Sequence, residues 1–220
     1  MFDRKELKAA AKEQIKGNIG KIFLCSLVAV VLIIVLYVVL GTIATTSLMA
    51  GNFGLFILIY SIIGCVSIII GPPLMISFVR IFLNLRQSQS PVINDIFWGF
   101  SITGKAIWLT IITGFFIYLW TLLLIIPGII KMYAYQLAPW YLTENHMDMT
   151  AREALRMSKK ATKGYKGKLF VLDLSFIGWG LLVGITFGIA GIWVFPYIYQ
   201  TYTNAYKQIA ENYAKANPMD

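Results

Sequence analysis

The sequence has little charge, one histidine and two cysteines. Only 13% of its 220 residues are charged, whereas soluble domains carry about 25%, so an ordinary water-soluble globule is excluded. A zinc site needs three or four clustered ligands, and His146 has only loop carboxylates beside it. Cys25 and Cys65 fall at different depths of two apolar segments and are predicted to be free thiols. We therefore expect no enzyme, no metal site and no cofactor.

Apolar residues are abundant, and the remaining charge is strongly basic. Hydrophobic residues make up 58% of the chain, and 19 Lys+Arg against 10 Asp+Glu give a net charge of +9. In a chain that is both apolar and basic, we expect the charged residues to cluster outside the apolar segments. Its length suits a single membrane domain over residues 1–220 and leaves no room for a separate catalytic domain.

Long apolar runs predict membrane-spanning helices, since crossing the hydrocarbon core takes about 20 apolar residues. Five runs qualify, the last of them short and unusually polar: residues 22–45, 55–79, 107–126, 169–187 and 189–206. A sixth run, residues 129–143, follows Pro127-Gly128, which is typical of a tight turn. We interpret residues 107–143 as a helical hairpin; the alternative is one bent helix followed by an interfacial segment.

Basic residues cluster at one end of the predicted spans, and an excess of Lys and Arg marks cytoplasmic loops. With six spans and both termini inside, 18 of the 19 basic residues are cytoplasmic and only Lys131 lies near the outer face. We therefore expect an all-α, multi-pass membrane protein with both termini cytoplasmic. It has six transmembrane helices as three hairpins and two basic amphipathic cytoplasmic helices, at residues 3–17 and 150–163.

Two segments of the chain repeat one another. Residues 4–24 and 151–171 agree at seven positions and share the core Lys-Gly-x-x-Gly-Lys. The pattern predicts an amphipathic helix, a bend at glycine and then a span. Asp3-x-x-Glu6 and Thr150-x-x-Glu153 resemble capping boxes that start the two helices. The repeat indicates either generic anchors beside lipid-facing helices or three related hairpins around a common axis.

Lysines at the boundaries of the predicted spans are expected to bind anionic lipid head groups. A lysine there can extend its ammonium to the phosphate level while its stem stays apolar, and anionic head groups attract basic segments. The predicted lipid contacts are Lys16, Lys21, Lys105, Lys159, Lys160, Lys163 and Lys168. We expect the bilayer and its anionic phospholipids as partners, together with a membrane protein or a second copy of the chain, and no nucleic acid.

Polar residues inside the predicted spans form a second candidate site. An acid in a span is costly and is by default a functional hypothesis, here a coupling-ion or proton site. We favour pairing of Asp173 within the bundle, with Lys168, Arg80 or a serine such as Ser175. The polar face of the last span should look into the bundle, where it either makes interhelical hydrogen bonds or lines a polar cavity. These candidate interior residues are Asp173, Tyr199, Gln200, Tyr202, Thr203 and Asn204.

Several of these stretches carry a family resemblance. Residues 4–8 (RKELK), 122–131 (LLLIIPGIIK) and 169–179 (LFVLDLSFIGW) resemble domain-of-unknown-function family 975, bacterial multi-span membrane proteins. That family is similar, more distantly, to the membrane domains attached to some glycerophosphodiester phosphodiesterases. The resemblance implies a location in a bacterial plasma membrane and membrane embedding without catalysis, and it brings no site residues.

Two functions are therefore compared. We expect a non-enzymatic protein that supports membrane integrity or binds lipids or a partner. The alternative is a transporter or lipid-handling protein that uses a polar cavity lined by the last helix and Asp173.

Overall fold

A computed structural model describes residues 2–217, and within that range the chain forms helices and no strand. The all-α prediction is confirmed for these residues. In chain order the elements are α1 (Arg4–Ile15), α2 (Ile19–Met49), α3 (Phe53–Arg86), η1 (Ile93–Ile102), α4 (Thr103–Leu123), α5 (Ile125–Tyr135), α6 (Ala138–Glu144), α7 (Ala151–Ala161), α8 (Lys166–Leu174), α9 (Ile177–Ile185) and α10 (Gly191–Ala216).

Four segments of the described chain are long and apolar enough to cross a membrane. They are Ile19–Met49, Phe53–Arg86, Ile93–Leu123 and Lys166–Ile185. These helices fit a multi-pass membrane protein, but the count of six spans is not confirmed. Residues 129–143 are divided between α5 and α6, which are 11 and 7 residues long, so neither reaches the ~20 residues that a span requires.

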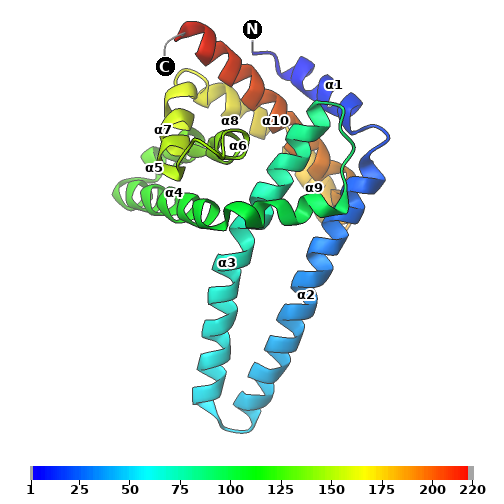
Figure 1. Cartoon of the computed structure of the whole chain (residues 1–220), viewed down its shortest axis with the longest axis vertical. Helices are drawn as coiled ribbons and strands as arrows, with labels where there is room; N and C mark the ends of the chain where they lie inside the picture. Colours follow the sequence, from blue (N-terminus) through cyan, green and yellow to red (C-terminus); the bar gives the residue numbers. More distant parts are fainter. Residues whose placement is uncertain (1, 218–220) are drawn as a thin grey trace.

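The α2–α3 pair forms a long hairpin that extends away from the rest of the molecule (Figure 1). Its tip turns at Gly51, whose φ of +75° favours glycine, and Asn52 accepts a 3.1 Å hydrogen bond from the N–H of Leu55 to start α3. Apolar side chains of the hairpin are exposed, including Val38 at 57% and Ile57 at 62%. Such a surface is suited to lipid rather than to water.

The base of the hairpin is fixed by η1, which packs against α3 just after its internal prolines. The N–H of Gly99 donates to Ser77 Oγ at 2.8 Å, and Ser77 Oγ donates to the Pro73 carbonyl at 3.1 Å. A Cβ atom at position 99 would lie 1.9 Å from that same carbonyl oxygen, so only glycine permits this approach. From this level α4 runs sideways, away from the direction of the hairpin (Figure 1).

The chain folds back between α4 and α5 at Leu124, earlier than the predicted turn at Pro127-Gly128. Leu124 is extended, with φ −161° and ψ 140°, and Pro127 falls in the first turn of α5, where a missing N–H is tolerated. Gly128 packs directly on Thr121, because a Cβ there would lie 2.3 Å from Thr121 Oγ1. The two helices therefore lie in close contact along the fold-back.

The remaining helices form a cap at the end of the molecule that also holds both chain termini (Figure 1). Leu7, Ala11 and Ile15 of α1 are buried, and α1 packs along α10. The apolar stripe of this amphipathic helix is therefore covered by protein and does not face lipid. The glycine bends predicted after the two amphipathic helices are present, with φ of +80° at Gly17 and +85° at Gly164.

Candidate functional site

A basic pocket lies between α4, α5 and α7. Its volume is about 450 Å³, and four of its nine lining residues are basic. None of the described residues that line it is acidic. The lining residues are Ile112, Phe116 and Trp120 of α4, Lys131 and Tyr135 of α5, and Arg152, Leu155, Arg156 and Lys159 of α7. We call this site the basic pocket.

Helix α7 supplies three of the four cations, at positions 152, 156 and 159. Spacings of four and three residues place side chains on one face of a helix. The capping box predicted at the start of this helix is present: the Thr150 N–H donates to Glu153 Oε2 at 2.7 Å, and the Glu153 N–H donates to Thr150 Oγ1 at 3.3 Å. At the first helix, Asp3 instead accepts a 2.8 Å bond from the N–H of Lys5.

A row of side chains next to the basic face of α7 is held against α5. Ser158 Oγ donates to the carbonyl of Ala134 at 2.8 Å, and Thr162 Oγ1 donates to the same oxygen at 3.3 Å. Ala154 and Leu155 are buried beside them. This attachment orients the basic face of α7 toward Lys131.

Aromatic rings accompany the cations in the pocket. Lys131 Nζ lies 4.2 Å from the ring centre of Trp120, and the guanidinium of Arg152 lies 5.7 Å from that of Trp108. Ring faces attract cations, but a ring carries no net charge. Arg156 also borders a neighbouring cleft that contains Asp148 and Glu153. The pocket itself therefore gathers like charges beside an apolar wall of Ile112 and Phe116.

The chemistry of this arrangement favours an anion with an apolar part. Guanidinium groups bind phosphate and carboxylate oxygens in a fork geometry, and Lys binds them as a point charge. An anion between the four cations relieves their mutual repulsion. The apolar wall excludes a fully hydrated ion from part of the pocket and offers contact to an alkyl chain.

Most of the predicted lipid-contact lysines lie outside the basic pocket. Lys105 donates to the His146 carbonyl at 2.6 Å, Lys168 lies over the ring of Tyr165 at 5.1 Å, and Lys160 lines the neighbouring cleft. Lys16 caps the end of α1, and Lys21 and Lys163 are exposed. Only Lys159 reaches the pocket.

Sequence reasoning missed the other three cations, Lys131, Arg152 and Arg156. The spacing of positions 152, 156 and 159 on one helix face was a usable signal for the two arginines. Lys131 carried no such signal, because its place depends on the fold-back of α5.

The position of Lys131 corrects the predicted charge distribution. The six-span arrangement put Lys131 near the outer face of the membrane and Lys159 on the cytoplasmic side. Both residues line one pocket, so they cannot lie on opposite sides of a bilayer about 30 Å thick. The physical reason is the fold-back at Leu124, which brings α5 into contact with α7.

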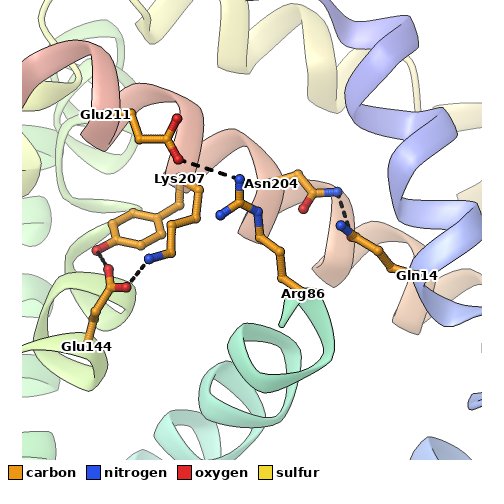
Figure 2. A network of polar contacts seen from close by, with 7 residues as sticks. Gln14, Arg86, Glu144, Asn204, Lys207 and Glu211 are labelled. Atoms are coloured by element: carbon orange, nitrogen blue, oxygen red, sulfur yellow. Dashed lines mark hydrogen bonds and ion pairs between the residues drawn. The ribbon is translucent and has the colours of Figure 1, made fainter. Parts of the chain in front are cut away.

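The polar face of α10 makes hydrogen bonds to α1. Gln14 Oε1 accepts from Gln200 Nε2 at 2.7 Å and from Asn204 Nδ2 at 2.9 Å, and Figure 2 shows Gln14 and Asn204 pointing toward each other. Thr203 Oγ1 accepts a 3.0 Å bond from the indole N–H of Trp140. These contacts attach the first and last helices to each other and to α6.

Charged residues continue this network toward the end of α10. Lys207 pairs with Glu144 of α6, and Arg86 at the end of α3 lies 3.6 Å from Glu211. Figure 2 shows both pairs, which join α10 to two other helices.

The other predicted interior residues have different partners. Asp173 accepts a 2.6 Å hydrogen bond from the hydroxyl of Tyr133. Tyr199 is 40% exposed and stacks on Phe82 with ring centres 5.6 Å apart. Tyr202 is buried, and its hydroxyl has no hydrogen-bond partner within the described chain. Asp173 is thus bonded to α5, whereas Gln200, Thr203 and Asn204 of α10 are bonded to α1 and α6.

The reactive side chains are isolated from one another. Cys25 is buried and Cys65 exposed, and both are free. His146 packs its ring edge-on against Trp98. Within residues 2–217 no group of three or more His, Cys, Asp or Glu side chains is arranged to hold a metal ion.

A family model described as "Protein of unknown function (DUF975)" matches residues 1–139 and 122–213 of the chain. The chain therefore belongs to this family. No curated protein and no solved structure matches it, and the likeness to the membrane domains of glycerophosphodiester phosphodiesterases stays a prediction.

Proposed function

We propose that this member of the DUF975 family is a non-enzymatic, multi-pass membrane protein that binds anionic phospholipid in its basic pocket. The observation that carries the proposal is the convergence of Lys131, Arg152, Arg156 and Lys159 without an acidic lining residue. An anionic phospholipid combines the two parts that the pocket accommodates, a phosphate for the cations and an alkyl chain for the apolar wall.

The charge distribution of the chain supports the same conclusion. Basic residues next to anionic lipid contribute about 1 kcal/mol each near a membrane surface. The basic pocket lies beside α4, which runs sideways from the base of the long hairpin (Figure 1). We place the pocket and both termini on the cytoplasmic side of a bacterial plasma membrane, where anionic lipids attract basic segments.

The test is lipid binding to the purified protein. Arg152→Gln, Arg156→Gln and Lys159→Gln are combined in one variant, and Lys5→Gln, Lys12→Gln and Lys215→Gln in a control that removes the same charge elsewhere. Native mass spectrometry with added phosphatidylglycerol counts the lipids that stay bound. We expect the pocket variant to lose at least about ten-fold in affinity, since three contacts of about 1 kcal/mol exceed the 1.4 kcal/mol of one decade.

The control variant should retain wild-type binding. Equal binding by the pocket variant and the control would show that net charge alone attracts the lipid, and the proposed site would then be wrong. Phosphatidylcholine, which has no net charge, should bind both variants and the wild type alike.

A further inference from the structure

A second cavity, of about 420 Å³, lies between α3, α4, α5 and α6. Its volume is within the roughly 300–1,000 Å³ that is usual for small-molecule sites. The walls are mostly apolar, with Met75 and Ile76 of α3, Leu109 and Ile117 of α4, and Met132 of α5. None of its described lining residues is charged, which separates it chemically from the basic pocket.

Two polar atoms of this apolar cavity lack partners. Thr113 and Gln136 line the cavity, and their Oγ1 and Oε1 atoms are buried and make no hydrogen bond within the described chain. By contrast, the hydroxyl of Thr110, one turn earlier on α4, has a partner: it donates to the Ala106 carbonyl at 3.1 Å. Buried polar groups are nearly always paired, so a free hydroxyl and a free amide oxygen in one cavity point to a ligand.

We propose that this cavity binds an uncharged amphiphile, a long alkyl chain that ends in a hydroxyl group. A hydroxyl both donates and accepts, so it can donate to Gln136 Oε1 and accept from Thr113 Oγ1. The alkyl chain then packs on Met75, Leu109 and Met132. A charged head group is disfavoured because its desolvation finds no opposite charge among the lining residues.

Gly114 offers a way to fill the cavity without disturbing its walls. It lines the cavity on α4, and a Cβ atom built there meets nothing within 4 Å. Gly114→Leu therefore adds a large side chain at a position that lines the cavity, with no clash at its Cβ atom. Gly104, near the start of the same helix, has equally open surroundings and does not line the cavity, so Gly104→Leu is a matched control.

The experiment is photolabelling of the purified full-length protein with two diazirine probes of equal length, an octadecanol and an octadecane. Peptide mass spectrometry locates the labelled residues. We expect the alcohol to label α4 and α5 about ten-fold more than the alkane, because its two hydrogen bonds together are worth about one decade of preference. Gly114→Leu should abolish this labelling, and Gly104→Leu should leave it unchanged.

A variant with Thr113→Val and Gln136→Leu tests the hydroxyl specificity. It should label equally with both probes, while the wild type prefers the alcohol. Equal labelling of the wild type by both probes, or unchanged labelling of Gly114→Leu, would overturn the proposal. Phosphatidylglycerol binding to Gly114→Leu should equal that of the wild type. The test of this cavity is therefore independent of the test of the basic pocket.

Discussion

Tyr133 of α5 donates a 2.6 Å hydrogen bond to the carboxylate of Asp173 in α8. The ring of Tyr133 also meets Phe170 edge-on, with ring centres 6.1 Å apart. This contact gives the acid inside the fourth apolar segment a defined partner and joins α5 to α8. It favours the pairing role of Asp173, which the sequence left open beside an ion or proton site.

Removing the hydroxyl of Tyr133, the donor of this hydrogen bond, should destabilise the protein. We expect Tyr133→Phe to lower the free energy of unfolding by about 1.5–3 kcal/mol, because hydrogen bonds to charged groups contribute that much. We check this loss of stability by thermal unfolding in detergent of Tyr133→Phe, Asp173→Asn and the double variant. The two changes should be strongly non-additive, and simple additivity would contradict the pairing role.

The second prediction is that Lys131 lies on the cytoplasmic side of the membrane. Because Lys131 and Lys159 line one pocket, a cysteine at position 131 should behave like one at the exposed position 163. Both should resist a membrane-impermeant thiol reagent in intact cells, whereas a cysteine at Asn52, at the tip of the long hairpin, should react.

The labelling uses a background in which Cys25 and Cys65 are replaced by serine. Reaction of the cysteine at 131 together with that at 52 would restore the six-span arrangement with Lys131 outside. Permeabilised cells supply the control that each cysteine is reactive.

The capping box at the start of α7 should make stability depend on pH. Hydrogen bonds from the backbone N–H of Thr150, and then from its hydroxyl, hold the pKa of Glu153 below its usual value. The contribution of Glu153 is therefore complete above the pKa of the unfolded chain and is lost as the pH falls through the lowered folded value. We expect the wild type to be more stable than Glu153→Gln at neutral pH.

That difference should vanish in acid. Unfolding curves of the wild type and Glu153→Gln between about pH 7 and pH 3 make the comparison. A difference that stays constant over this range would show that the charged form of Glu153 has no special role.

The glycine bends supply a fourth prediction with internal controls. Gly17 and Gly164 have φ of +80° and +85°, and a Cβ at either meets nothing within 4 Å. Gly17→Ala and Gly164→Ala should each cost about 1–2 kcal/mol, from the left-handed conformation alone. Gly20→Ala and Gly167→Ala, at helical positions with equally open surroundings, should be neutral or stabilising by up to about 1 kcal/mol.

Denaturant unfolding of the four variants separates these cases. Equal effects within each pair, one from each repeated segment, are expected because the paired positions have the same backbone conformation. Destabilisation by Gly20→Ala as large as that by Gly17→Ala would contradict the conformational explanation.

The sequence by itself determined the features that depend on neighbouring residues. Its apolar composition and helical spacing predicted an all-α chain with membrane-spanning segments. The repeated Lys-Gly-x-x-Gly-Lys core predicted a bend at glycine after each amphipathic helix, and Thr150 with Glu153 predicted the capping box. Each of these follows from local conformation or composition, so a single sequence contains the necessary information.

Only the tertiary structure decided which distant segments meet. The fold-back at Leu124 brings Lys131 to Arg152 and Arg156, so only Lys159 among the predicted lipid contacts lies in the basic pocket. Gln14 receives the amides of α10, across almost the whole chain. Such contacts depend on how amphipathic faces pack against one another, and neither helical periodicity nor a count of charges along the chain specifies that pairing.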